Sequence, residues 1–157
     1  MIQHRRRFLG LLVGGLGMVL LSSMGYTQTP DKPSNKEVLQ LFDKWNAALQ
    51  TGKADEVVKL YAPDAILLPT VSNKVRHNPA EIKDYFEHFL PKHPIGRINE
   101  SNIRTYGGVV INSGTYTFTL TKDGQKSDVP ARFTFVYRKV GDSWLIAEHH
   151  SSAMPEK

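Results

Sequence analysis

The chain has 157 residues, with 20 Lys and Arg, 15 Asp and Glu, and no cysteine. That length allows one domain with a substantial core and is too short for two ordinary domains. The lack of thiols excludes disulfides, zinc–thiolate sites and cysteine nucleophiles, and it leaves the redox compartment open.

Residues 1–25 are typical of an export signal. Three arginines at positions 5–7 precede an uncharged apolar run from Phe8 to Leu21, which is shorter than the roughly 20 apolar residues of a membrane span. The stretch from Arg5 to Leu9 resembles the twin-arginine export motif, and ordinary secretion is the alternative because His4 and Gly10 depart from that motif. We expect a periplasmic or secreted protein without stable membrane anchoring once the signal is removed.

Removal of this signal would lower the formal net charge from +5 to +2, because the segment contains three arginines and no acidic residue. No cluster of Lys and Arg remains in the rest of the chain. Nucleic acid is therefore not an expected partner.

A long amphipathic helix is predicted after a short leader. Positions 26–33 are polar with two prolines, which indicates a disordered leader. Ser34 and Glu37 have the spacing of a capping box, so the helix begins there, and Gly52 ends it. Its apolar stripe has steps of three and four and consists of Val38, Leu41, Phe42, Trp45, Ala48 and Leu49. Trp45 is interpreted as core, with a place in a ligand cavity as the alternative.

Two shorter helices and a strand follow in the prediction. Residues 54–61 form a second helix that Pro63 ends, and residues 65–69 form a short strand. Asn78 then provides a cap for a third helix, whose first position is Pro79. The apolar side chains of this helix are Ile82, Tyr85, Phe86, Phe89 and Leu90.

From Ile95 onward the apolar period changes from 3.6 to 2, which is typical of strands. Strands are predicted at residues 102–106 and 109–112, on either side of Gly107-Gly108, and alternation marks further strands around residues 115–120 and 132–138, with turns between them. The order of helix, helix, strand, helix and then four or five antiparallel strands predicts an α+β domain. Its helices would cover one face of a curled sheet.

The last predicted strand changes from an apolar run into a glutamate, two histidines and two serines. Strict alternation places Ile146, Glu148 and His150 on one face, and His149 and Ser151 on the other. Both faces begin apolar, so this strand is expected inside a sheet or against another subunit. The adjacent histidines are the densest concentration of groups that titrate near neutral pH.

Several motifs resemble the association-domain family of calcium/calmodulin-dependent protein kinase II, which includes bacterial stand-alone proteins of the SgcJ/EcaC type. The motifs are Trp45-Asn46, Tyr61-Ala62-Pro63-Asp64-Ala65, the strand from Arg132 to Arg138, Gly141-Asp142-Ser143-Trp144 and, above all, the tail from Glu148 to Pro155. The resemblance covers residues from Ser34 to Pro155.

The resemblance implies an NTF2-like cone over residues 34–157, in which a curved antiparallel sheet wraps around the long first helix. It also implies self-association into dimers or larger assemblies. The kinase hub has Arg where this chain has Ser151, so an anion-binding role does not transfer to that position. No kinase catalytic domain is expected.

A ligand pocket of the cone is expected to involve His149, His150, Tyr116, Trp45 and Arg132. If the protein is an enzyme, these residue types best suit proton transfer at a carbonyl compound, as in isomerases and cyclases that resemble this fold. His150 or Glu148 would be the base, and Tyr116 or Tyr137 would donate to the enolate oxygen. In the structural alternative, the tail forms a hydrogen-bonded layer that fixes the sheet edge and the subunit contact.

No metal and no cofactor are expected. Adjacent residues of a strand point to opposite faces, so His149 and His150 would share an ion only at a bulge. SgcJ/EcaC-type relatives have an oxidoreductase label. This sequence does not support that label, because it contains no dinucleotide-binding loop, thiol pair or flavin signature. The leading expectation is an exported homo-oligomeric domain with a small-molecule pocket and a binding or assembly role. A small isomerase or cyclase is the alternative, and an oxidoreductase is suggested by the family label alone.

Overall fold

The computed structural model describes residues 32–156, so the predicted export signal and most of the leader lie outside the described residues. The elements are, in chain order, α1 (Asn35–Gln50), α2 (Ala54–Val58), β1 (Tyr61–Leu68), α3 (Pro79–Phe89), the 3₁₀ helix η1 (Leu90–Lys92), β2 (Ile95–Tyr106), β3 (Val109–Lys122), β4 (Gln125–Val140) and β5 (Ser143–Ala153). Within this range, no helix combines the length and the apolar character that crossing a membrane requires.

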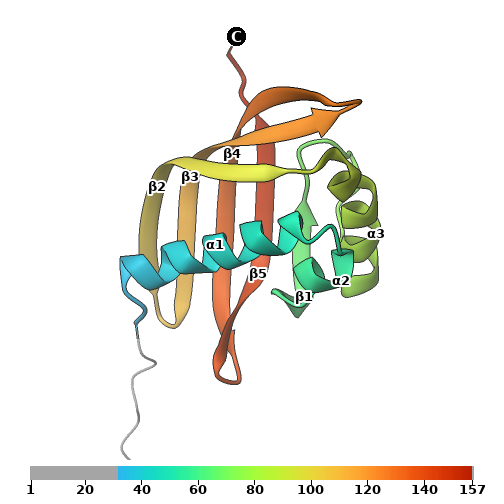
Figure 1. Cartoon of the computed structure of the whole chain (residues 1–157). Helices are drawn as coiled ribbons and strands as arrows, with labels where there is room; N and C mark the ends of the chain where they lie inside the picture. The colour runs from blue at the N-terminus through green and yellow to red at the C-terminus, as the bar shows by residue number, and fades with distance from the viewer. Residues whose placement is uncertain (1–31, 157) are drawn as a thin grey trace, which may run out of the picture.

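The strands form one open, curved sheet in the order β1-β5-β4-β3-β2. Strands β2 to β5 pair antiparallel, and β1 pairs parallel with β5. Figure 1 shows α1 lying across one face of the sheet, with α2 and α3 packed near β1. The predicted α+β class, with a curved sheet around the long first helix, is confirmed, and the parallel β1 edge is an addition to it.

The capping box at the start of α1 forms as predicted. The backbone N–H of Glu37 donates to Ser34 Oγ at 3.3 Å, and the Glu37 carboxylate accepts from the Ser34 backbone N–H at 2.7 Å. The Ser34 hydroxyl also donates to the Glu37 carboxylate at 2.7 Å, and this bond, followed by the one from the Ser34 backbone N–H, lowers the pKa of Glu37. Such a cap stabilises a helix by about 1 kcal/mol. The helix buries one side against the sheet through Val38, Phe42, Trp45 and Leu49.

Asn46 fixes α1 to the first residues of β2. Its side-chain oxygen accepts from the Gly96 backbone N–H at 2.8 Å, and its side-chain N–H donates to the Gly96 carbonyl at 2.9 Å. A Cβ at Gly96 would lie 3.1 Å from the Phe118 ring. Position 96 therefore has little room for a side chain, and the Trp45-Asn46 pair combines a core residue with a backbone clamp.

A bulge in β2 contributes to the curvature of the sheet. The register between β2 and β3 shifts between Ile98 and Glu100, and bulges bend the strand that contains them. Opposite this shift, a Cβ at Gly114 would lie 2.0 Å from the Glu100 carbonyl oxygen. Only glycine fits there without a movement of the backbone.

The start of β1 differs from the prediction. The second helix ends at Val58 rather than at position 61, and Tyr61 begins a strand. Pro63 cannot donate a ladder hydrogen bond, but β1 lies at the edge of the sheet, where proline is tolerated. As a consequence, the Tyr61 side chain is buried in the core with 4 % of its surface exposed.

Strict alternation along β5 is wrong because the strand contains a bulge. Tyr137 pairs with Ile146 and Val136 pairs with Glu148, which leaves Ala147 as an extra residue. The phase changes there, so Ile146, His149 and Ser151 are all buried, whereas Glu148 and His150 are exposed.

We call the side of the sheet away from α1 the outer sheet face. Its neighbouring rows are Ile111, Val136 and Glu148; Ser113, Thr134 and His150; and Thr115, Arg132 and Ser152.

Candidate functional site

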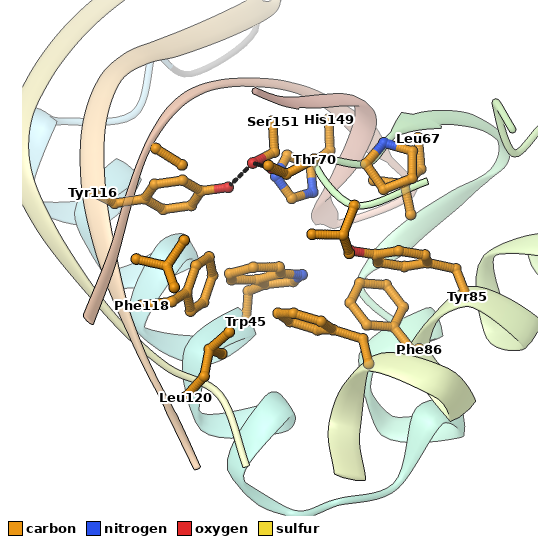
Figure 2. Close-up of a pocket in the computed structure, with 15 residues that line it drawn as sticks. Trp45, Leu67, Thr70, Tyr85, Phe86, Tyr116, Phe118, Leu120, His149 and Ser151 are labelled. Carbon is orange, nitrogen blue, oxygen red and sulfur yellow. Dashed lines mark hydrogen bonds between the residues drawn. The ribbon is translucent and has the colours of Figure 1, made fainter. Parts of the chain in front are cut away.

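A small internal cavity lies among the sheet, Trp45 of α1 and the side chains of α3 (Figure 2). Its volume is about 40 Å³, and its wall is mostly aromatic and aliphatic. The apolar lining residues are Trp45, Leu67, Pro69, Val71, Phe86, Phe89, Phe118, Leu120, Val129 and Ala131; the polar ones are Thr70, Tyr85, Tyr116, His149 and Ser151.

A buried hydrogen-bonded chain positions His149 at this cavity. Trp45 Nε1–H donates to the Tyr61 hydroxyl oxygen at 3.2 Å, and that oxygen lies 2.9 Å from His149 Nδ1. Burial raises the pKa of Tyr61 well above its ordinary value, so the hydroxyl keeps its hydrogen. The indole can only donate, so the Tyr61 hydroxyl hydrogen has His149 Nδ1 as its acceptor among the hydrogen bonds of the described residues, and we assign it there. The neutral imidazole then carries its own hydrogen on Nε2.

His149 is almost fully enclosed by aromatic rings. It is 3 % exposed, stacks on Phe135 with ring centroids 4.0 Å apart, and meets the edge of Trp45 at 5.2 Å. Burial lowers the pKa of His149 from 6.5 to about 3, with a smaller contribution from the charge of His150. The imidazole is therefore neutral at pH 7. Among the described residues, its Nε2 atom has no hydrogen-bond partner.

A second polar group in the cavity wall is held together by two hydrogen bonds among three hydroxyls. The Tyr116 hydroxyl donates to Ser151 Oγ at 2.5 Å, and Ser151 Oγ also forms a hydrogen bond with Thr70 Oγ1. Burial raises the pKa of Tyr116 above its ordinary value, so this phenol stays protonated at neutral pH. The three hydroxyls join β3, β5 and the segment after β1 beside His149, as the labelled side chains in Figure 2 show.

The structure divides the residues predicted for a ligand pocket into two groups. Trp45, Tyr116 and His149 meet at the internal cavity. His150 and Arg132 do not reach it, because both lie on the outer sheet face. There they line a shallow hollow with Thr134 and Ser152, and Arg132 Nε donates to Ser152 Oγ at 3.2 Å.

The predicted pairs of base and donor are also separated. Glu148 and His150 are exposed on the outer sheet face, whereas Tyr116 is buried beside the cavity. Tyr137 is buried too, and it lines a different groove, together with Leu60 and other residues. Neither predicted base therefore meets Tyr116 in the cavity.

Sequence reasoning missed the roles of three polar residues of the site. These are Tyr61, Thr70 and Ser151, whose hydroxyl connects Tyr116 with Thr70. Tyr61 was placed at the end of a helix, although Pro63 two positions later is equally typical of an edge strand. Thr70 lies in an irregular segment without periodicity. In the sequence, these two residues are 88 and 81 positions away from their β5 partners, and no local signal reports such a contact.

In residues 32–156, no group of three or more His, Asp or Glu side chains is arranged to hold a metal ion. The described residues therefore present no candidate metal centre, and the predictions about metal and cofactor stay predictions.

Comparison with known proteins decides the family. The family model of the calcium/calmodulin dependent protein kinase II association domain matches residues 34–155. The chain belongs to this association-domain family. A crystal structure of such an association domain from Xanthomonas campestris is 54 % identical to it, with a TM-score of 0.77, and the match covers 82 % of this chain and 93 % of that one.

More distant solved structures show that this association domain has the NTF2-like fold. An NTF2-like superfamily protein from Salmonella enterica is 15 % identical with a TM-score of 0.68, over 78 % of this chain and 92 % of that one. A Streptomyces avermitilis protein of the NTF2-like family, described as a dehydratase, is 13 % identical with a TM-score of 0.68, over 77 % and 97 %. No curated protein matches the chain. At such identities the likeness concerns the fold alone, because one fold hosts many functions.

Proposed function

We propose that this association-domain protein is an exported homo-oligomer that binds a small organic molecule in its internal cavity and has no catalytic activity of its own. One observation carries the binding role: a mostly apolar cavity contains a buried, neutral imidazole whose Nε2 atom has no partner. A buried polar atom without a partner costs about 1–3 kcal/mol, which a bound acceptor would offset. Apolar cavities with a few placed polar groups are the usual form of small-molecule sites.

The chemistry of the cavity wall supports binding over catalysis. Proton transfer from a carbon acid needs a base within hydrogen-bond reach of the substrate. The described residues that line the cavity include no carboxylate and no amine. His149 presents a protonated Nε2 and uses Nδ1 as the acceptor for Tyr61, so in this tautomer it donates rather than accepts.

The outer sheet face supports the assembly role. The helices lie on the other face, so no helix or strand of residues 32–156 covers the middle of this face (Figure 1). Half-buried Ile111 and Val136 lie side by side there, next to Glu148, and Arg132 lies two rows away. An apolar centre with charges of both signs around it suits a two-fold contact, in which the same surface meets its own copy.

Light scattering on the chain from residue 26 onward tests assembly. We expect a dimer or a larger species at micromolar concentration, and Val136→Lys should shift it toward monomer by placing a charge in the contact. Thr121→Lys is the matched control, because position 121 lies on the same side of β3 but ten residues from Ile111, about 30 Å along the strand. A strict monomer in the parent chain would remove the assembly role.

Export is supported by the arginines and the apolar run of residues 5–21. Cell fractionation should find the protein outside the cytoplasm, with an N-terminus generated near residue 25. Replacing Arg5 and Arg6 with lysine should block export if the twin-arginine route is used and leave it intact if ordinary secretion is used. A cytoplasmic protein of full length would contradict export by either route.

A small isomerase or cyclase is the second candidate, because the cavity does contain an imidazole. Exchange of the α-hydrogens of cyclopentanone for deuterium, followed by NMR, detects proton transfer at a carbonyl compound without knowledge of the natural substrate. We expect no exchange above the buffer rate. Faster exchange that His149→Phe abolishes would favour an enzyme with its site in the cavity, and loss in His150→Phe would instead support the base predicted on the outer sheet face.

A further inference from the structure

We propose that the cavity selects an uncharged, largely apolar molecule that presents one hydrogen-bond acceptor, such as a carbonyl oxygen, to the Nε2–H of His149. This inference rests on the proposed small-molecule role and adds the chemical class of the ligand. Three properties of the site carry it: the tautomer of His149, the charge of the cavity wall and the number of free donors.

The tautomer follows from the chain of hydrogen bonds behind the imidazole. If His149 carried its hydrogen on Nδ1, the Tyr61 oxygen would accept from both His149 and Trp45. The Tyr61 hydroxyl hydrogen would then have no acceptor in the described part of this core. That arrangement leaves two buried polar groups without a partner, the Tyr61 hydroxyl hydrogen and the lone pair of His149 Nε2, whereas hydrogen on Nε2 leaves one, the Nε2–H. The alternative, with hydrogen on Nε2, satisfies Trp45, Tyr61 and Nδ1 together and directs a donor to the ligand.

The charge of the wall excludes an anionic ligand. No Lys or Arg is among the described residues that line the cavity, and burial keeps His149 neutral at pH 7 by lowering its pKa to about 3. The buried cation Arg76 is not among the lining residues: its guanidinium lies 5.8 Å from the centre of the Tyr85 ring, and its Nη2 is 3.6 Å from Asp84. A carboxylate in the cavity would therefore lose its hydration without gaining a counter-charge.

The number of free donors limits the polar part of the ligand. Two hydrogen bonds join the hydroxyls of Tyr116, Ser151 and Thr70, so one hydrogen, on Ser151 or Thr70, is left over. Among the described residues that line the cavity, His149 Nε2 is the fully buried side-chain atom without a hydrogen-bond partner. Tyr85 directs its hydroxyl end toward the cavity from the opposite wall (Figure 2). The site thus offers one rigid donor, His149 Nε2–H, together with hydroxyls that can rotate, in an aromatic surround. This arrangement suits an apolar body whose acceptor lies at His149.

The volume limits the size of the ligand. A cavity of about 40 Å³ is a few times the space that one water needs and well below the roughly 150 Å³ that holds benzene. A short chain is therefore the largest occupant of the cavity as it stands, and a small ring fits when part of the wall moves. Val71 is 57 % exposed and Val129 is 36 % exposed, so the wall is thin on their side. A ring would enter there by displacing these side chains rather than the aromatic core.

The test compares three probes of nearly equal shape by NMR titration of the Trp45 and His149 side-chain nitrogens: cyclopentanone, methylenecyclopentane and cyclopentanecarboxylate. Cyclopentanone should bind roughly tenfold more tightly than methylenecyclopentane, the factor that one hydrogen bond provides. The carboxylate should not bind in the cavity. His149→Phe keeps a ring and removes the donor, so it should abolish the preference for the ketone, whereas His150→Phe on the outer sheet face should keep it.

The outcomes separate the two proposals. If none of the probes shifts Trp45 and His149, the cavity is no ligand site and the small-molecule role itself fails. If the hydrocarbon binds as tightly as the ketone, or the carboxylate binds best, the binding role stands and the inferred ligand class is wrong. The comparison of probes on the unaltered protein decides this even if His149→Phe does not fold.

Discussion

His149 and His150 are neighbours with the same side chain, and the fold gives them opposite environments. His149 is 3 % exposed, stacked on Phe135 and hydrogen-bonded to Tyr61. His150 is exposed on the outer sheet face, opposite Thr134. The cause is the pleat of β5 together with its bulge at Ala147, which determines which imidazole enters the core. Titratable residue types alone therefore do not identify a site, because the phase of the strand assigns their chemistry.

The largest difference between the two histidines is expected in stability. His149→Ala removes a buried ring and leaves the Tyr61 hydroxyl hydrogen without an acceptor, so it should lower the free energy of unfolding by about 3 kcal/mol. His150→Ala removes an exposed ring and should change it by less than about 0.5 kcal/mol. Urea unfolding of both variants measures the difference. Equal midpoints for the two variants would show that the assignment of inner and outer histidine is wrong.

The next effect is a loss of stability with falling pH. The pKa of His149 is lowered to about 3 in the folded protein from 6.5, so the unfolded chain binds the proton more strongly. The stability that neutral His149 contributes to the folded protein is present in full above pH 6.5 and is lost as the pH falls toward 3. Between pH 7 and pH 5 the free energy of unfolding should decrease by about 2 kcal/mol from this group.

Carboxylates such as Glu37 and Glu81 have a pKa that the fold lowers from an ordinary value of 4.5. The stability that they contribute is therefore lost mainly below pH 4.5. Urea unfolding between pH 5 and pH 7 therefore isolates the imidazole, and His149→Phe should remove this part of the pH dependence. An unchanged slope in that variant would mean that His149 is not the buried neutral group.

A smaller effect is expected from Tyr61→Phe. This change keeps the ring but removes the hydroxyl that connects Trp45 Nε1 and His149 Nδ1. Two buried polar atoms lose their partner, which should cost about 1–2 kcal/mol in urea unfolding. It should also shift part of the His149 population to the tautomer with hydrogen on Nδ1, visible in nitrogen NMR. A fully retained Nε2–H tautomer would show that Tyr61 does not set the hydrogen position.

Much of the fold could be predicted because its signals are local. The capping box at Ser34, the stripe that ends at Leu49 and the cap at Asn78 each lie within one element. The bulge at Ala147 could not be predicted, because it depends on the register between β4 and β5. The same limit applies to the edge position of Pro63, which only the order of the strands reveals.

The candidate site was predicted in part for the same reason. Trp45, Tyr116 and His149 were expected near a pocket and do line the cavity, whereas Arg132 and His150 do not. The alternation rule correctly placed the two histidines on opposite faces of the sheet. It wrongly placed Glu148 and His150 on the same face as Ile146. The tautomer of His149 depends on Tyr61, which is 88 positions away in the sequence.

Nitrogen NMR of the imidazoles at pH 7 tests the central claim most directly, namely that His149 is neutral and presents Nε2–H to the cavity. With nitrogen-labelled histidine, His149→Phe identifies the relevant signals. We expect Nδ1 to resonate as an unprotonated nitrogen and Nε2 as a protonated one, with no change down to pH 5. A charged imidazolium, or a hydrogen located on Nδ1, would contradict the account.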